Sequence, residues 1–594
     1  MEDDKNKAQL DKLLEARPGE EESNELIVRM ALQLYKQSAE ASRDERLLWK
    51  KWLDLRDGRH WEGVQWSDKR SQITANLTQS FIESQIAALT DNRPTIFCQP
   101  RDPRDQALAH DLEQAIYFVL DQNDWGILFP KVVRTSVSLG PGLVKGIWNP
   151  HIVRGGERGM IQLEPVMPFS FFPDNEATTL KAARFISHVQ DLPYDWLLEN
   201  YPEYADKIPT GEWDLLGHAN KYGLDGGWDG VVPVMGTSGS AAWLMPYARQ
   251  TGEKMRGLGQ RARVMELLVR QTQNEMRRFL LCNGHVLENE PYGVPTLGGG
   301  FQPFAEYPWV MFPYRPLQEK FWPTGVVNGL EGLQLLLNKS ESLILDQLLW
   351  NLYSAWVVDQ EANLDYPISN APNEVIKKSK AGEVRREHPS PISGEAFGFS
   401  THIREMMEQF TGHVEILQGK NPTGVEAGKA LALLQEQANS RIRQNARYLE
   451  HALEDLGELI IDFIAAYWIE PRWIRLLGPR GQIAYKQMAG SMFRGHEFDV
   501  SVKAGSTLPF SREQRMAEAA ELYQLGAFGT PGSPGAVAEV LKARDWPEWE
   551  QIVARLEEEQ AQAAQQQAQL AQQEQQRAAA AKARAAPPPP PRAE

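Results

Sequence analysis

The stretch from residue 325 to residue 470 constrains the fold of this chain more than any other part of the sequence. Its hydrophobic residues recur at helical spacing in three blocks, which predict helices over 325–356, 395–417 and 429–470. A polar spacer at 357–394 separates the first two helices, and a Gly/Pro loop at 418–428 separates the last two. We can assign this order to no enzyme fold. It suits several copies arranged around a channel, with helices along the bore, the spacer at one rim and the loop pointing inward.

Size and composition indicate a soluble globular protein with several parts. A chain of 594 residues is long for a single hydrophobic core, so we expect two to four subdomains. Hydrophobic residues make up 42% and charged residues 24%, which is ordinary for a folded soluble protein. The 18 Trp residues favour assembly, because large amphipathic rings are common at interfaces.

The formal net charge of −16 argues against a protein that wraps DNA, because such a protein neutralises phosphates with a basic surface. The same charge is compatible with a protein through which DNA slides. An acidic wall repels the phosphate backbone and prevents it from sticking.

The sequence offers no disulfide framework and no membrane segment. It has two cysteines, Cys98 and Cys282, which excludes a CxxC metal site and indicates a reducing compartment. The acidic N-terminus is not a secretory signal. The most apolar segment, 330–350, is interrupted by the polar residues Asn338, Lys339, Glu341 and Asp346, so we expect no transmembrane helix.

Outside the central stretch, the periodicities alternate between those of helices and of strands, so the predicted fold class is α+β and mainly helical. We expect helices over 24–52, 76–90, 105–123 and 125–139, and strands at 95–100, 143–149 and 160–168. The pair Asn283-Gly284 predicts a hairpin turn between two strands. Residues 1–25 are acidic and predicted flexible, and 206–255 form a Gly-rich surface insertion. Residues 557–594 are rich in Gln, Ala and Pro, and we expect a solvated helix or disorder there.

The loop at 418–428 has the composition expected of a constriction in a channel. Its glycines allow sharp turns, and Pro422 stiffens one of them. The polar residues able to meet phosphates briefly are Gln418, Lys420, Asn421 and Thr423. One Lys per copy around a ring would give many weak and equivalent contacts. The alternative is a plain connection between two helices.

The spacer contains a local reversal of charge. Between residues 374 and 388, five basic and three acidic residues give a net charge of +2. The basic residues are Lys377, Lys378, Lys380, Arg385 and Arg386. They could meet DNA or an acidic partner. The stretches at 374–379 and 382–387 could form strands of an intersubunit sheet, because edge strands seek partners. The alternative is a solvated hairpin around Ala381-Gly382.

Catalytic motifs fail when tested. The segment at 423–430 has the spacing of a phosphate-binding loop, but Thr423 replaces its first Gly and Ala430 replaces the hydroxyl that holds Mg²⁺. The chain has no HExxH and no GxSxG pattern and no close His pair at metal spacing. Its carboxylate pairs at 54–57 and 102–105 are typical of solvated helix faces. We therefore expect no enzyme activity, cofactor or metal, and any ATP-driven motor would be another protein.

Several blocks together resemble the portal proteins of tailed bacteriophages, specifically the larger portals of short-tailed and related phages. They are the helix, Asn-Arg-Pro turn and strand at 73–102, the Gly-containing strand at 139–149, the aromatic segment at 164–177, the helix start at 325–349, the turn and helix at 423–438, and the strand at 498–515. The likeness covers roughly residues 70–555 and rests on order and spacing. The chain departs from it at Gly428-Lys429-Ala430, where relatives often have Ser-Gly, and in the insertion at 206–255.

The resemblance implies a portal fold with wing, stem, clip and crown regions that assembles as a ring of twelve copies at one capsid vertex. It implies a wing at 26–324, a first stem helix at 325–356, a clip at 357–394 and a second stem helix at 395–417. It further implies a channel loop at 418–428, a long wing helix at 429–470, and a wing strand with crown helices at 471–556. The tail at 557–594 would be disordered or a helical barrel.

The implied function is passage of double-stranded DNA during packaging and ejection. The implied partners are the terminase motor, capsid and scaffolding proteins and a tail adaptor, in a virion assembled in the cytoplasm of a bacterial host. Two alternatives stay open at this point. One is another head–tail connector or adaptor, and the other is a nucleic-acid enzyme with an unrecognised acidic site.

Overall fold

The computed structural model describes two compact units. They comprise Met1–Pro471 with Ala489–Leu508, and Arg472–Met488 with Pro509–Glu594. Apart from a few single positions, the described residues are 21–90, 96–154, 157–204, 261–282, 284–295, 301–353, 355–362, 382–387, 394–411, 428–477, 483–494, 498–502, 519–529 and 532–543. Residues 1–20, the insertion at 206–255 and most of the tail lie outside this set, so the predictions made for them stay predictions.

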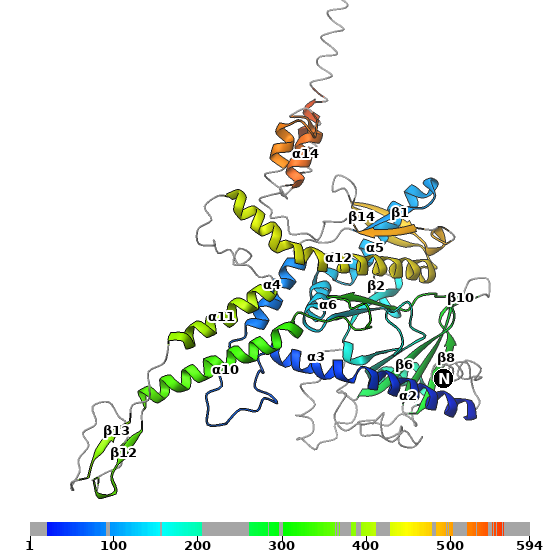
Figure 1. The fold of residues 1–594 in the computed structure, drawn as a ribbon. Coiled ribbons are helices and arrows are strands. Elements are labelled where there is room, and N and C mark those ends of the chain that lie inside the picture. Colours follow the sequence, from blue (N-terminus) through cyan, green and yellow to red (C-terminus); the bar gives the residue numbers. More distant parts are fainter. Residues whose placement is uncertain are drawn as a thin grey trace, which may run out of the picture. The chain divides into compact units, whose positions relative to one another are not determined.

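A five-stranded antiparallel sheet, with helix α2 (Glu21–Ala41) along one face, forms one part of the first unit (Figure 1). Its strands, in spatial order, are β4 (Phe171–Pro173), β5 (Phe185–Pro193), β6 (Arg261–Thr272), β7 (Glu275–Cys282) and β8 (His285–Pro291). The side chains of strand β6 alternate between the two faces of the sheet. Met265, Leu267 and Val269 join the core under α2, whereas Ala262 and Val264 join a second core on the opposite face. That second core includes α7 (Tyr194–Asn200) and is flanked by η3 (Pro202–Tyr204).

The sequence predicted one turn of this sheet correctly and the helix beside it only in part. The predicted turn between two strands is confirmed at Gly284, whose φ of +73° lies in the left-handed region that glycine adopts without strain. The predicted helix at 24–52 is two consecutive helices, α2 and α3 (Arg43–Arg56), separated at Ser42. Leu26, in the first turns of α2, is 39% exposed.

A three-stranded sheet with helices beside it forms the centre of the first unit. Its order is β11 (Trp309–Pro313), β2 (Pro141–Arg154) and β3 (Glu157–Val166). Helices α4 (Leu77–Thr90) and α6 (Trp125–Leu139) pack together, and α6 also packs on β2. Gly140 joins α6 to β2 with φ +109°, and a Cβ there would lie 2.0 Å from the carbonyl oxygen of Pro323. The short helix η2 (Pro168–Ser170) follows β3, and β9 (Gly293–Pro295) pairs with β10 (Phe301–Pro303) in a separate two-stranded sheet.

The long helix α12 (Gly428–Tyr467) matches the predicted helix at 429–470 closely and packs on β11, β16 (Phe498–Val502) and α5 (Gln106–Gln122). Trp148 of β2 stacks on Tyr467 near its end, with ring centroids 4.9 Å apart. Strand β16 pairs with β1 (Ile96–Pro100), so segments about 400 residues apart close one small sheet. The short helix η1 (Pro103–Asp105) follows β1 and packs on α5. The short helix η6 (Gly490–Met492) precedes β16 and packs on α12. Cys98 and Cys282 are both buried and unbonded.

Two helices and a short hairpin form an extension of the first unit (Figure 1). Helix α10 (Val327–Leu352) packs against α11 (Gly394–Thr411), and β12 (Trp356–Val358) pairs with β13 (Val384–Arg386). The first helix was predicted to reach residue 356, but it ends at Leu352 because residues 356–358 pair as a strand. η4 (Gln360–Ala362) follows β12.

The second unit contains an antiparallel pair of strands and helices. Strands β14 (Arg472–Leu477) and β15 (Ile483–Met488) pair over their whole lengths, and neither was predicted. The predicted helices of this unit are present at 519–524 and as α14 (Pro534–Ala543). The amide of Gly532 donates a hydrogen bond to the hydroxyl of Tyr523 at 2.8 Å, which ties the two helical stretches together.

Candidate functional site

The residues predicted for the channel loop and for most of the basic cluster lie outside the described part of the chain. These are Gln418, Lys420, Asn421 and Thr423 of the loop, and Lys377, Lys378 and Lys380 of the cluster. The structure describes Arg385 and Arg386 on β13, at the end of the extension built by α10 and α11.

The hairpin of β12 and β13 gives its two arginines different surroundings. Arg386 lies opposite Trp356, with its guanidinium carbon 5.6 Å from the ring, and its Nη2 donates to the carbonyl oxygen of Leu352 at 2.8 Å. Arg385 lies opposite Val357, is 62% exposed, and has the Glu387 carboxylate 4.0 Å away. Arg386 therefore holds the hairpin to the end of α10, whereas Arg385 presents its charge to solvent.

Strand β13 pairs with β12 of the same chain. The sequence had predicted that residues 374–379 and 382–387 are strands of an intersubunit sheet, or that they form a solvated hairpin around Ala381-Gly382. Residues 374–379, proposed as the other strand, lie outside the described residues.

Specific contacts hold α10 and α11 together. Glu341 Oε1 accepts hydrogen bonds from Ser400 Oγ at 2.6 Å and from Arg404 Nη2 at 2.8 Å. The Ser400 bond and the Arg404 charge together lower the pKa of Glu341 despite its partial burial. Gly329 lies against the ring of Phe410, so close that a Cβ would be 1.7 Å from Phe410 Cζ. The absent side chain lets the two helices approach.

A polar stripe runs along another face of α10. Gln334, Asn338, Ser342 and Asp346 recur every four residues, and each accepts a hydrogen bond from a backbone amide of segment 71–78. The sequence had marked Asn338 and Asp346 only as interruptions of an apolar segment. Their spacing of four, shared with Gln334 and Ser342, was the signal that could have identified a single polar face.

The extension also exposes a set of large apolar side chains with fractional exposures between 39% and 66%. They are Leu336, Leu343, Leu348, Leu349, Trp350, Leu352, Tyr353, Val357, Phe397 and Phe399. Large apolar side chains that stay exposed together on one part of a protein can mark an interaction site. Within the part of the chain that the structure describes, no helix combines the length and the apolarity needed to cross a bilayer.

The sequence model of one family, described as phage P22-like portal protein, matches residues 32–588. The chain belongs to the P22-like portal protein family. A search of curated proteins finds no match. The family match covers nearly the whole chain and includes both compact units and the extension of α10 and α11. It selects the portal from the three functions that the sequence had left open.

Membership gives the function at the level of the family. The chain is a structural portal protein of a tailed phage, which serves genome packaging and connects head to tail. Portal proteins form a ring at a capsid vertex, with DNA and with motor and tail components as partners. The α+β class predicted from the sequence agrees with the helices and sheets of the structure.

Proposed function

We propose that this chain closes into a ring of twelve copies in which α10 and α11 form the stem around a DNA channel. The observation that carries the proposal is the apolar surface of the extension, which a single copy leaves in water. Leu336, Leu343 and Trp350 recur every seven residues on α10 and are 40%, 43% and 55% exposed. A repeat of seven is the spacing at which one helix packs along another. A heterologous contact that repeats around an axis closes into a ring.

In this assignment the wing comprises 26–324, the stem helices 325–356 and 395–417, and the clip 357–394. Residues 418–428 form the channel loop, 429–470 the long wing helix and 471–556 the wing strand and crown, with 557–594 as a tail. The clip would meet the terminase motor during packaging and the tail adaptor afterwards. The exposed charge of Arg385 suits an acidic partner or passing DNA.

The channel loop would touch DNA without gripping it. We assign transient phosphate contacts to Gln418, Lys420, Asn421 and Thr423, and further contacts at the clip to Lys377, Lys378, Lys380, Arg385 and Arg386. Deleting 418–428 should leave ring assembly intact and impair DNA retention or packaging. Loss of rings in the deletion variant would instead make the loop a structural connection.

The stem assignment is tested with a matched pair of variants. Leu343 of α10 and Leu47 of α3 are both helical and both 43% exposed. Leu343→Asp should reduce the fraction of protein in rings about ten-fold or more, because burying an unpaired carboxylate between copies costs several kcal/mol. Leu47→Asp should assemble as the parent does. Native mass spectrometry measures both, and equal assembly of the two variants would contradict the stem interface.

A further inference from the structure

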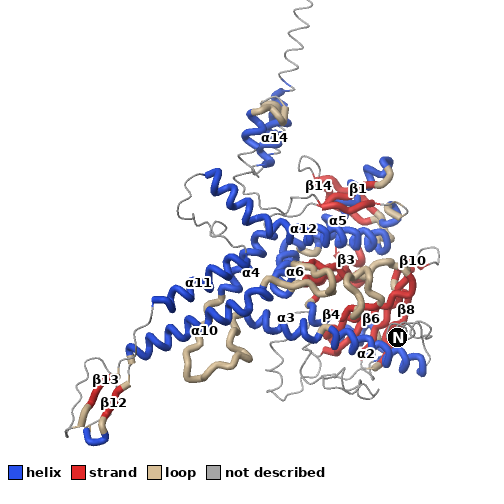
Figure 2. Tube along the Cα trace, viewed as in Figure 1, coloured by secondary structure: helices blue, strands red, loops and turns tan. Residues whose placement is uncertain are grey.

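Residues 57–76, which we call the strap, connect α3 to α4, and their second half lies along α10 (Figures 1 and 2). The strap contains neither helix nor strand. Irregular loops of this length are uncommon in compact domains, and those that occur are usually either functional or disordered. The strap is nevertheless well defined, because both its base and its second half are held by hydrogen bonds.

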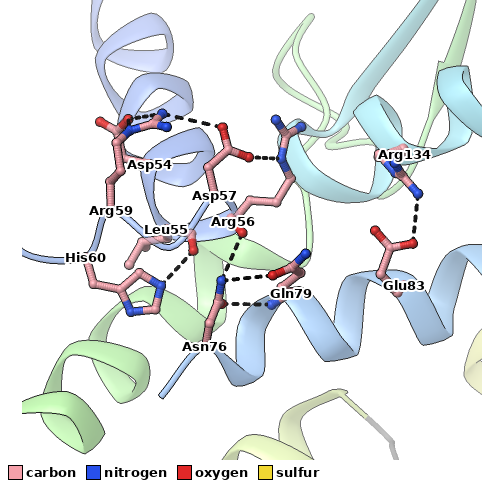
Figure 3. A network of polar contacts seen from close by, with 10 residues as sticks. All are labelled: Asp54, Leu55, Arg56, Asp57, Arg59, His60, Asn76, Gln79, Glu83 and Arg134. Carbon is pink, nitrogen blue, oxygen red and sulfur yellow. Dashed lines mark hydrogen bonds and ion pairs between the residues drawn. The ribbon is translucent and has the colours of Figure 1, made fainter. Parts of the chain in front are cut away.

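The base of the strap is closed by Asn76 (Figure 3). Its Nδ2 donates to the carbonyl oxygen of Arg56 at 3.0 Å, which joins the two ends of the strap. Its Oδ1 accepts from the amide of Gln79 at 3.1 Å, so Asn76 also caps α4. His60 Nε2 bonds the carbonyl oxygen of Leu55 at 2.7 Å, and its Nδ1 bonds Asn338 Nδ2 of α10 at 2.6 Å.

The second half of the strap is held to α10 by a ladder of side chains. The amides of Ser71, Ile73 and Ala75 donate to Asp346 Oδ1, Ser342 Oγ and Asn338 Oδ1 at 2.8, 2.9 and 3.1 Å. The amide of Thr78, in the first turn of α4, donates to Gln334 Oε1 at 3.0 Å.

The geometry of helix and extended chain explains this match. Four helical residues rise about 6.0 Å, and two extended residues rise about 6.6 Å. Every fourth side chain of α10 therefore meets every second amide of the strap.

Three successive residues of α10 lie in three different environments: exposed to solvent, buried in the protein, and covered by the strap. Residues of a helix point about 100° apart, so neighbours face three directions. Leu336 is 40% exposed, Leu337 is fully buried, and Asn338 lies under the strap at 1% exposure. The division recurs along the helix: Ser342 is buried under the strap, Leu343 is 43% exposed, and Ile344 is 8% exposed.

We propose that the strap selects the face of α10 that meets a second copy of this chain. Its backbone amides donate hydrogen bonds to Asn338 and Ser342 and so cover the polar face of α10. The apolar stripe of Leu336, Leu343 and Trp350 stays exposed and contacts the neighbouring copy. The inference rests on the proposed ring. A ring of one size needs one rotation between copies. A bare polar face on α10 would offer a second way to pack, and would allow rings of other sizes or open chains.

Two variants loosen the strap without touching the apolar stripe. Ser342→Ala removes the acceptor of the Ile73 amide, and Asp346→Ala removes that of the Ser71 amide at the half-exposed end of the ladder. Hydrogen exchange by mass spectrometry should show the affected amides exchanging about ten-fold faster or more. Protection at Thr78 should be kept, since Gln334 is unchanged. Ser340→Ala makes the same chemical change as Ser342→Ala, on the same helix but off the ladder, and should leave exchange as in the parent.

Native mass spectrometry of the same proteins completes the test. The parent and Ser340→Ala should give rings of one size, whereas Ser342→Ala and Asp346→Ala should give several sizes or free chains. Faster exchange together with unchanged rings would overturn the role of the strap and leave the proposed ring standing. Altered assembly without faster exchange would also overturn it. A parent chain that stays monomeric would instead contradict the ring itself. Asp346→Ala removes only the outermost bond, so it keeps the test decisive if Ser342→Ala does not fold.

Discussion

Lys145 of β2 donates a hydrogen bond to Glu266 of β6 at 2.5 Å, and this buried pair joins the three-stranded sheet to the five-stranded sheet. Both side chains are less than a tenth exposed. Arg278 Nε donates to the second oxygen of Glu266 at 3.0 Å, and Arg278 Nη1 lies 3.1 Å from Glu288 Oε2. Burial by itself would raise the pKa of Glu266. The charges of Lys145 and Arg278 outweigh burial and hold this pKa well below its ordinary value.

Removing the charge of Glu266 should destabilise the first unit strongly. Glu266→Gln leaves the ammonium of Lys145 buried without its counter-charge, which costs about 3–5 kcal/mol of unfolding free energy. The exposed pair of Glu83 and Arg134, 2.8 Å apart, supplies the control (Figure 3). Glu83→Gln should change the unfolding free energy by less than about 1 kcal/mol. Denaturant titrations of both variants check this, and equal losses would show that burial of the network is unimportant.

His188 should contribute a loss of stability as the pH drops below about 6.5, the ordinary pKa of histidine. Burial lowers the pKa of His188, whose Nδ1 lies 3.9 Å from Glu266 Oε2. The unfolded chain then binds a proton that the folded chain resists. The contribution is complete above the unfolded pKa and is lost as pH falls, by at most about 1.4 kcal/mol per pH unit. Glu266 stays ionised in this window because its pKa is low.

His188→Gln should flatten this dependence between pH 7 and 5, as followed by thermal unfolding at each pH. Some slope should remain, because burial also lowers the pKa of His60. His402→Gln, at a position 63% exposed on α11, serves as the control and should keep the slope of the parent. An unchanged slope in His188→Gln would mean that this histidine does not resist protonation in the fold.

Two glycines of α10 should respond to alanine in opposite directions. At Gly329 the new Cβ would lie 1.7 Å from Phe410 Cζ, so α11 must move and stability should fall by about 1–3 kcal/mol. At Gly332 nothing lies within 4 Å, and alanine should stabilise the helix by up to about 1 kcal/mol. Unfolding free energies of the two variants test this directly. A neutral Gly329→Ala would refute close packing of the two helices.

Substitutions of Arg385 and Arg386, the two arginines of β13, should have different effects. Arg386→Ala removes the bond to the carbonyl of Leu352 and the contact with Trp356, so amides of β12 and β13 should exchange faster. Arg385→Ala should keep that protection while weakening retention of DNA or of an acidic partner, with a reduced salt dependence. Measured partner retention equal to that of the parent in Arg385→Ala would remove Arg385 from the proposed surface.

Local patterns in the sequence predicted much of the fold, and long-range pairing accounts for what they missed. The bounds of helices α4, α5, α6 and α12 lie within three residues of those predicted from periodicity, and the predicted turn is at Gly284. The pairing of Cys98 with Val500 across β1 and β16 has no local signal, because it depends on segments far apart in the chain. The strands β14 and β15 also went unpredicted. The roles of Asn338 and Asp346 depend on the strap, which no helical pattern on α10 specifies.

Cryo-electron microscopy of the purified chain distinguishes a closed ring from a monomer. We expect closed rings of twelve copies, with α10 and α11 around a central hole of roughly 20 Å or more, wide enough for duplex DNA. The stripe of Leu336, Leu343 and Trp350 should be covered by the neighbouring copy in those rings. Discrete monomers at all concentrations, or rings whose stripe faces solvent, would contradict the account.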